Sequence, residues 1–234
     1  MDRAVVLLSG GMDSATLLRH VRFCLKAGRV HALTFYYGQK HRREIAMARW
    51  QARAAGVEEH REINLGMFAG LVDGGSALTD EAIAIPDLSA LRRGEKRQPA
   101  TYVPNRNMVL LSLAAAYAEA RGIRELFYGA QAQDEYGYWD CTEDFVAKLN
   151  AVLRLNRRKA VRIRAPFATF RKVDVLRMGL KLGVEFLHTW TCYRGAKRAC
   201  GNCPSCVERA GAFRQAGQAD PLERGRATNQ GENG

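Results

Sequence analysis

No apolar stretch in the 234-residue sequence is long enough to cross a lipid bilayer, which excludes a membrane-spanning helix. A secretory signal is lacking too, because Met1-Asp2-Arg3 leads into a short apolar run that ends in a glycine loop. We therefore expect a cytoplasmic protein with no membrane partner.

Cysteine is scarce. The chain holds six, and three of them crowd into residues 200–206. In a cytosolic chain such a cluster indicates metal binding and not disulfide bonds. Apolar residues make up 47% of the sequence, which suffices for a packed core and excludes disorder for most of the chain. The length fits one α/β domain with a small appendage.

Lys and Arg outnumber Asp and Glu by 36 to 24, which gives a formal net charge of +12. Such an excess is typical of proteins that bind nucleic-acid phosphates, and it also steers anionic substrates such as ATP. The basic residues are dispersed along the chain, as on a solvated surface. We therefore do not expect direct contact with nucleic acid.

Apolar runs and helical stretches alternate along most of the chain. We expect strands near 4–8, 30–35, 60–64, 125–128 and 161–163, and helices near 14–26, 42–55, 106–121, 142–155 and 172–182. This alternation predicts an α/β fold, a doubly wound parallel sheet with helices on both faces. The irregular residues 65–100 are expected to cover an active site.

Three parts are expected along the chain. Residues 1–185 form the α/β domain, residues 186–217 form a small helical metal-binding unit, and residues 218–234 form a polar, glycine-rich tail that we expect to be disordered, above all from about residue 224. Cys24, in the first predicted helix, is expected to be a core thiol.

The most informative segment is Ser9-Gly10-Gly11-Met12-Asp13-Ser14, between a predicted strand and a predicted helix. Its glycines let backbone N–H groups approach a phosphate, and the helix N-terminus adds partial positive charge. The common P-loop has a Lys after its second glycine, where this chain has Met12 and Asp13. The segment resembles the pyrophosphate loop of the N-type ATP pyrophosphatases, Ser-Gly-Gly-x-Asp-Ser. The resemblance implies that ATP binds at residues 8–15, which are Leu8, Ser9, Gly10, Gly11, Met12, Asp13, Ser14 and Ala15.

A second pattern, C-x7-C-x2-C-x2-C, is formed by Cys192, Cys200, Cys203 and Cys206. Four thiolates suit a closed tetrahedral Zn²⁺ site with no position left for water. An iron–sulfur cluster also takes four cysteines and stays open as an alternative. We expect structural zinc that stabilises a C-terminal unit with little core of its own.

Further segments occur in the order found in one family. They are Phe-Tyr-Tyr-Gly-Gln-Lys-His at 35–41, Thr-Tyr-Val-Pro-Asn-Arg-Asn at 101–107, Gly-Tyr-Trp-Asp-Cys at 137–141 and Thr-Trp-Thr-Cys-Tyr at 189–193. Together with the loop and the cysteines, they resemble the 7-cyano-7-deazaguanine synthase family from about residue 4 to residue 221.

That resemblance implies an ATP-dependent ligase which converts 7-carboxy-7-deazaguanine and ammonia to 7-cyano-7-deazaguanine, with release of AMP and pyrophosphate. One ATP activates the carboxylate as an acyl adenylate, and ammonia then forms the amide. A second ATP activates the amide oxygen, and loss of AMP leaves the nitrile. Mg²⁺ is expected with ATP. The family's members often pair, although the sequence shows no dimer face.

The loop amides and hydroxyls are expected to hold the departing pyrophosphate. Asp13 would hold Mg²⁺ or fix the loop amides. Arg106, at a helix start, would clamp the substrate carboxylate or stabilise charge on the α-phosphate, and Lys172 is a second phosphate ligand. Residues expected to contact the guanine-like substrate follow the strand near 125–128, and they are Gln131, Asp134, Tyr138 and Asp140.

Three departures from the family pattern border this predicted pocket. Asn105 stands where a glycine is usual, Gln131 where an asparagine is usual, and residues 169–171 differ from the usual segment before the Lys. A divergent relative that stops at 7-amido-7-deazaguanine, or transfers the activated deazaguanine to another acceptor in DNA modification or defence, is one alternative. A tRNA-thiolating ATP pyrophosphatase is a second, and a non-enzymatic nucleic-acid-binding protein is a third.

Overall fold

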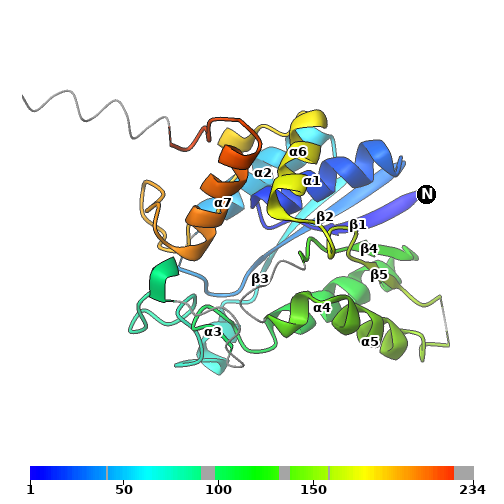
Figure 1. Ribbon diagram of the computed structural model, residues 1–234. Helices are drawn as coiled ribbons and strands as arrows, with labels where there is room; N and C mark the ends of the chain where they lie inside the picture. Colours follow the sequence, from blue (N-terminus) through cyan, green and yellow to red (C-terminus); the bar gives the residue numbers. More distant parts are fainter. Residues whose placement is uncertain (41, 91–97, 132–137, 158, 224–234) are drawn as a thin grey trace, which may run out of the picture.

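The computed structural model describes residues 1–40, 42–90, 98–131, 138–157 and 159–223. Its centre is a five-stranded parallel sheet in the order β3-β2-β1-β4-β5 (Figure 1). The strands are β1 (Arg3–Leu7), β2 (Arg29–Tyr36), β3 (Glu59–Asn64), β4 (Glu125–Phe127) and β5 (Arg162–Arg164). The chain runs outward from β1 to β3 and then returns to β4 beside β1. The carboxyl ends of β1 and β4 therefore form a topological switch point, where open α/β sheets bind ligands.

Helices cover both faces of the sheet, as Figure 1 shows. The α-helices of the described residues are α1 (Met12–Arg19), α2 (Arg43–Ala55), α3 (Met67–Leu71), α4 (Arg106–Ala120), α5 (Glu143–Leu153), α6 (Lys172–Lys181) and α7 (Pro204–Gln215). One core cluster joins α1, α2 and α6 to the sheet, and a second joins α4 and α5 to its other face. Ala4 and Val6 of β1 belong to the first cluster and Val5 to the second, which explains the unbroken apolar run. The predicted fold class is confirmed.

Helix α1 differs from its prediction. It begins at Met12 and continues after Arg19 as a π-helical turn, His20–Cys24. Cys24 is exposed, so its expected place in the core was wrong. A π-helical turn holds more residues than an α-helical turn, and α-helical spacing therefore does not predict which side chains there face the core. The π turn lies at the far end of α1 from the glycine loop.

The chain after α6 packs against the domain. Arg209 of α7 is 2% exposed, and its Nε and Nη2 donate to the two carboxylate oxygens of Asp220 at 2.8 and 3.0 Å. Asp220 is 5% exposed, so residues 218–223, which the sequence placed in the tail, contribute the acidic partner of a buried ion pair with α7. Residues 224–234 lie outside the described residues. Within the described ranges, no helix is both long and apolar enough to cross a membrane.

Candidate active site and metal centre

A cavity of about 340 Å³ lies at the carboxyl edge of the sheet, beside the switch point between β1 and β4. Its wall comes from the loop after β1, the starts of α4 and α6, the segment after β4, and residues 190–208. Predicted site residues that line it are Leu8, Ser9, Gly11, Met12, Asp13, Ser14, Arg106, Gln131, Tyr138 and Lys172. Gly10, Ala15 and Asp140 are not among the lining residues, and Asp134 lies outside the described residues.

The glycine loop passes very close to α2. Gly10 has a φ of +83°, and a Cβ built on it would lie 2.0 Å from the carbonyl oxygen of Glu44 and 2.8 Å from the amide nitrogen of Ala48. Only glycine fits there. Gly10 therefore fixes the path of the loop, while the next residue, Gly11, faces the cavity.

Two serines close the loop on itself. The hydroxyl of Ser14 accepts a hydrogen bond from the amide of Ser9 at 3.2 Å and lies 3.0 Å from the Ser9 hydroxyl. The Ser14 hydroxyl also donates to the carbonyl of Gly11 at 3.1 Å. The amides at the start of α1 have no partners within the helix, so this arrangement presents backbone donors and hydroxyls to an anion.

Asp13 and Lys172 form an ion pair at the cavity wall. The Nζ of Lys172, at the start of α6, donates to one carboxylate oxygen of Asp13 at 2.6 Å. Burial disfavours the charged amine, but the charges of Asp13 and Glu208 outweigh it and raise the pKa of Lys172. The second carboxylate oxygen of Asp13 is buried and has no hydrogen-bond partner among the described residues.

Arg106 begins α4 and is held from two sides. One guanidinium nitrogen donates to the hydroxyl of Tyr37 at 3.0 Å, and Nε donates to the side-chain oxygen of Asn107 at 3.1 Å. Burial opposes its charge, but Tyr37 and Asp140 outweigh that cost and raise the pKa of Arg106. Arg106 therefore enters the cavity as an oriented, permanent cation.

Asp140 and Tyr138 take different positions. Asp140 is 1% exposed, and one of its carboxylate oxygens has no hydrogen-bond partner in the described part of the chain. Burial raises the pKa of Asp140, and the charge of Arg106 opposes this shift. Asp140 therefore lies behind Arg106, whereas Tyr138 faces the cavity with its hydroxyl hydrogen-bonded to Thr101.

All three departures from the family pattern lie among the described residues. Asn105 adopts φ of +53° and ψ of +14° just before α4, a left-handed conformation that glycine and asparagine tolerate best. The Asn at this position thus keeps the backbone that a glycine would allow. Gln131 donates to the carbonyl of Phe170 at 3.3 Å, so the second and third departures contact each other.

Some lining residues were not assigned a role from the sequence. Five of them lie in the segments that carried the resemblance, and they are Tyr37, Thr101, Trp190, Thr191 and Tyr193. The segments therefore indicated the site, but they did not indicate which side chains face the cavity. Glu44 and Glu208 also line the cavity and carried no signal.

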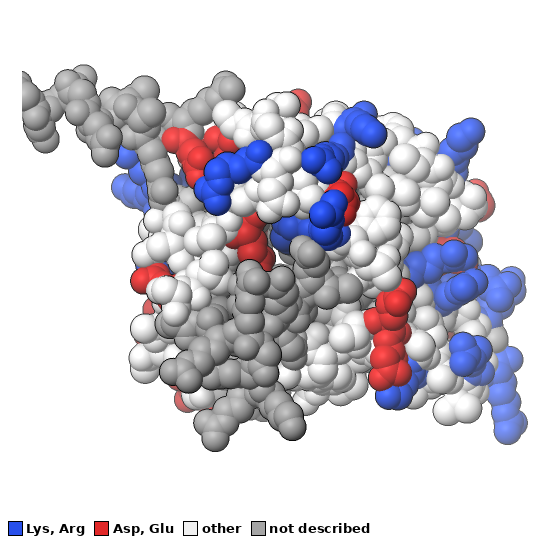
Figure 2. Space-filling view, in the orientation of Figure 1, with Lys and Arg blue, Asp and Glu red and all other residues white. Residues whose placement is uncertain are grey.

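Charge is distributed unevenly between the cavity and the surface. The described lining includes three acidic residues, Asp13, Glu44 and Glu208, and two basic ones, Arg106 and Lys172. Figure 2 shows Lys and Arg side chains at several places on one face, with Asp and Glu among them. The net charge of +12 therefore does not arise from the cavity lining.

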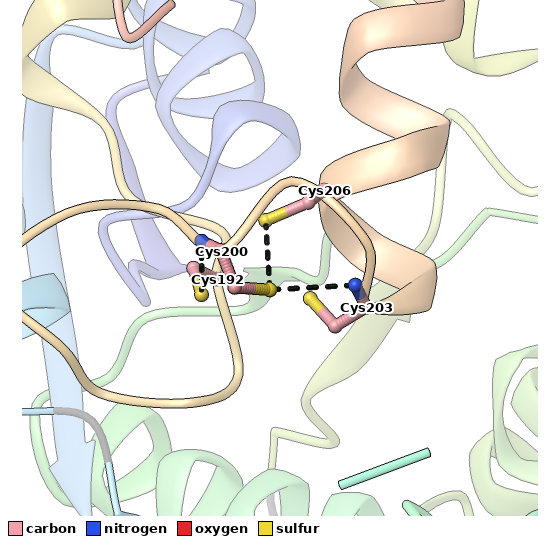
Figure 3. Close-up of side chains that lie close together, drawn as sticks. All are labelled: Cys192, Cys200, Cys203 and Cys206. Carbon is pink, nitrogen blue, oxygen red and sulfur yellow. Dashed lines mark hydrogen bonds between the residues drawn. The ribbon is translucent and has the colours of Figure 1, made fainter. Parts of the chain in front are cut away.

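The four predicted metal-binding cysteines converge beside the cavity (Figure 3). Their sulfur atoms all lie within 4.8 Å of one another, and those of Cys200 and Cys206 are 3.9 Å apart. Four thiolates about 2.3 Å from one tetrahedral ion would be about 3.8 Å apart. The amides of Cys200 and Cys203 donate to the sulfurs of Cys192 and Cys200 at 3.4 and 3.3 Å. The donor set and its spacing therefore fit a metal ion.

Helix α7 contributes to this centre. Cys203 is its N-cap residue and Cys206 lies in its first turn, where the helix dipole favours thiolates. In the metal-free protein, mutual hydrogen bonds lower the pKa of the Cys192 thiol and raise the pKa values of Cys203 and Cys206. The cysteines share an apolar cluster with Tyr37, Leu78 and Trp190, all of which line the cavity.

Comparisons with known proteins agree with this geometry. The family model described as queuosine biosynthesis protein QueC matches residues 3–217. The 7-cyano-7-deazaguanine synthase of Marinobacter nauticus is 44% identical over 221 residues, which cover 94% of this chain and 96% of that protein. The 7-cyano-7-deazaguanine synthase of Archaeoglobus fulgidus is 44% identical over 222 residues, which cover 94% of this chain and 89% of that protein.

The chain is also similar in fold to a solved structure. The U34-tRNA thiolase NcsA from Methanococcus maripaludis, solved with its 4Fe-4S cluster, gives a TM-score of 0.50 at 14% identity. The match covers 96% of this chain and 67% of that one. At this identity the comparison shows a shared fold and no more.

Proposed function

The chain belongs to the queuosine biosynthesis protein QueC family, and on that premise we propose that it is a 7-cyano-7-deazaguanine synthase. The reaction would join 7-carboxy-7-deazaguanine and ammonia with two ATP. The observation that supports this most is one cavity lined by both the glycine loop and the oriented guanidinium of Arg106. A carboxylate is a poor electrophile and needs a good leaving group. In this proposal the glycine loop would hold the group that leaves, and Arg106 would hold the group that is activated.

The glycine loop is the proposed site for the outer phosphates of ATP. Ser9, Gly11 and Ser14 line the cavity, and Gly10 fixes the loop against α2. When the substrate oxygen attacks the α-phosphorus, the bond to the β-phosphate oxygen breaks and pyrophosphate takes the electron pair. The backbone amides at the start of α1 are already in place to stabilise that charge, and the Ser14 hydroxyl would join them by turning from the Gly11 carbonyl to a phosphate oxygen.

Asp13 is the residue that would hold Mg²⁺. Its free, buried carboxylate oxygen is a hard ligand of the kind that Mg²⁺ prefers. Mg²⁺ would neutralise phosphate charge in a cavity whose described lining has more acids than bases. Lys172, held by Asp13 at 2.6 Å, is placed to contact a phosphate oxygen once the nucleotide is bound.

Arg106 is the proposed partner of the substrate carboxylate and of the negative charge that develops during adenylation. Its orientation by Tyr37 and Asn107 removes most of the entropy cost of placing the cation. The same cation would serve the second half-reaction. There the amide oxygen attacks the α-phosphorus of a second ATP, pyrophosphate leaves, and AMP then departs with the former amide oxygen. Loss of both amide N–H protons then gives the nitrile.

The metal is proposed to be structural Zn²⁺. Four cysteines and no other described ligand form a closed set, and a closed set leaves no position for water or substrate. Elemental analysis should find one zinc per chain in a colourless protein. A brown protein with iron and sulfide would assign a cluster instead.

The test is an incubation with 7-carboxy-7-deazaguanine, ammonium and Mg-ATP, followed by mass spectrometry and AMP quantification. We expect the nitrile and two AMP per nitrile. Arg106→Met should abolish the product, whereas Arg154→Met, at the exposed end of α5, is the matched control and should not. Amide without nitrile would support the divergent branch, and absence of AMP would refute the enzyme proposal.

A further inference from the structure

We propose that Trp190 couples the four-cysteine metal centre to the pyrophosphate loop, so that bound metal and bound nucleotide each raise the affinity for the other. This inference rests on the proposed function, because it takes the glycine loop to be the nucleotide site. Trp190 is then a positioning residue, because it acts by connecting the loop to the metal centre.

Trp190 contacts both sites directly. Its backbone amide donates to the carbonyl of Gly10 at 2.9 Å, and its indole Nε1 donates to the carbonyl of Cys192 at 3.0 Å. The side chain is 4% exposed, so both hydrogen bonds are protected from water. Gly10 cannot move away from Trp190 freely, because α2 encloses its other side.

A second connection runs through α7. Arg209 lies one turn after Cys206, and its guanidinium donates to the Thr189 hydroxyl at 2.7 Å and to the Phe186 carbonyl at 2.9 Å. Arg209 is 2% exposed and is neutralised by Asp220. The helix that carries Cys206 is therefore attached to the residues just before Trp190.

A third connection reaches α2. The guanidinium of Arg43 lies 4.5 Å from the centre of the Trp190 ring, and it donates a hydrogen bond to the carbonyl of Lys197. Lys197 lies between Cys192 and Cys200. The start of α2 thus contacts both Trp190 and the cysteine-bearing loop, while the next turns of α2 enclose Gly10.

The metal ligands also set the position of the cavity wall. Thr191, Tyr193, Ser205 and Glu208 line the cavity, and each is one or two residues from a metal-binding cysteine. If the metal leaves, the four cysteines are no longer held around one ion. The backbone of these wall residues is then no longer fixed. The nucleotide would then have to order the wall on binding, at a cost in affinity.

Thermodynamic linkage makes this coupling measurable from either side. If the metal raises nucleotide affinity by some factor, the nucleotide raises metal affinity by the same factor. Coupling between sites commonly lies between about fivefold and 150-fold. We expect at least about fivefold here, and most of it should appear as slower metal release from the nucleotide-bound protein.

The experiment starts from the zinc-loaded protein, so that no unfolded form is needed. Binding of a non-cleavable α,β-methylene ATP analogue with Mg²⁺ is measured first, by calorimetry. Zinc release to a chromophoric chelator is then timed with and without saturating analogue. The variant Trp190→Phe removes the indole donor to Cys192 and keeps the ring and the backbone amide. Its matched control is Trp50→Phe, since Trp50 stacks on His188 at 4.0 Å and does not line the cavity.

The wild type and Trp50→Phe should release zinc at least about fivefold more slowly with the analogue, and Trp190→Phe should show a ratio near one. If Trp190 had only a structural role, Trp190→Phe would change the zinc-release rate equally with and without the analogue. A ratio like that of the wild type would therefore refute the coupling through Trp190. Bound analogue with an unchanged release rate in the wild type would refute the coupling but not the proposed function. No analogue binding at all would refute the proposed function itself. If Trp190→Phe does not fold, the wild-type ratio alone decides whether the sites are coupled.

Discussion

Gly10→Ala should destabilise the fold, because this residue combines a left-handed backbone with a contact that no side chain can accept. At φ of +83°, an alanine costs about 1–2 kcal/mol relative to a right-handed conformation. The added methyl group would lie 2.0 Å from the Glu44 carbonyl oxygen, which is backbone and cannot rotate away. Overpacking of that kind costs a further 1–3 kcal/mol or so. The expected loss is therefore about 2–5 kcal/mol.

Gly56→Ala isolates the first of these two costs. Gly56 caps α2 with φ of +62°, and a Cβ there meets nothing within 4 Å. Its replacement should cost only the left-handed conformation, reduced by the lower entropy of the unfolded chain, or about 1 kcal/mol. The difference between the two variants measures the clash with α2.

Urea denaturation followed by circular dichroism gives both free energies of unfolding, and calorimetry gives the melting temperatures. For a chain of this size, each kcal/mol shifts the melting temperature by about 2–4 °C, so Gly10→Ala should melt about 4–20 °C below the wild type. Equal losses for Gly10→Ala and Gly56→Ala would show that the loop can move away from α2. The argument that Gly10 anchors the phosphate-binding loop would then fail.

Four further outcomes are expected. Asp13→Asn should lower AMP formation at least about 100-fold in a chain that still folds, because a proposed Mg²⁺ ligand and the charge that holds Lys172 are lost together; retained turnover would remove Asp13 from the mechanism. Arg106→Lys should lower kcat/KM about 100-fold, since lysine has no planar fork, and near-normal kinetics would contradict the proposed role of the guanidinium. Cys203→Ser should release the metal, as measured by plasma mass spectrometry, and one metal per chain in the variant would disprove the ligand assignment. Hydrogen bonds from Arg61 and Tyr117 lower the pKa of Glu59 to about 2. The stability advantage of wild type over Glu59→Gln should therefore be complete above about pH 4.5 and disappear as the pH falls toward 2, whereas a constant difference would argue against the ion pair.

Local patterns in the sequence predicted most of the fold. Strands buried on both faces appear as continuous apolar runs, and glycines follow α2 and α4 where left-handed residues end a helix. The boundaries of β3 and most other elements moved by a residue or two, whereas α1 gives way to the π-helical turn after Arg19. Cys24 was misplaced because a π-helical turn has no signature in hydrophobic spacing.

The site was predictable as a set of segments and not as a set of contacts. The loop, the start of α4, the start of α6 and the cysteines were each recognised, because each has its own local pattern. The Asp13–Lys172 pair joins residues 159 positions apart, and the bond from Trp190 to Gly10 spans an even longer separation. Such pairs depend on how α6 and the cysteine-bearing segment pack against α1 and α2, and no local pattern encodes that packing.

Asp140 illustrates the same limit for a single side chain. Its segment follows the strand that ends at the switch point, so a carboxylate there was expected to face the substrate. The short helical turn Trp139–Cys141 instead places Asp140 inside the protein, 1% exposed, while Tyr138 and Cys141 on either side line the cavity. A buried carboxylate without full hydrogen bonding is costly unless a cation lies near, and the charge of Arg106 acts on it. Burial beside Arg106 thus gives Asp140 a physical reason to support the charge of the arginine, and no pattern in the sequence indicates that the side chain turns inward.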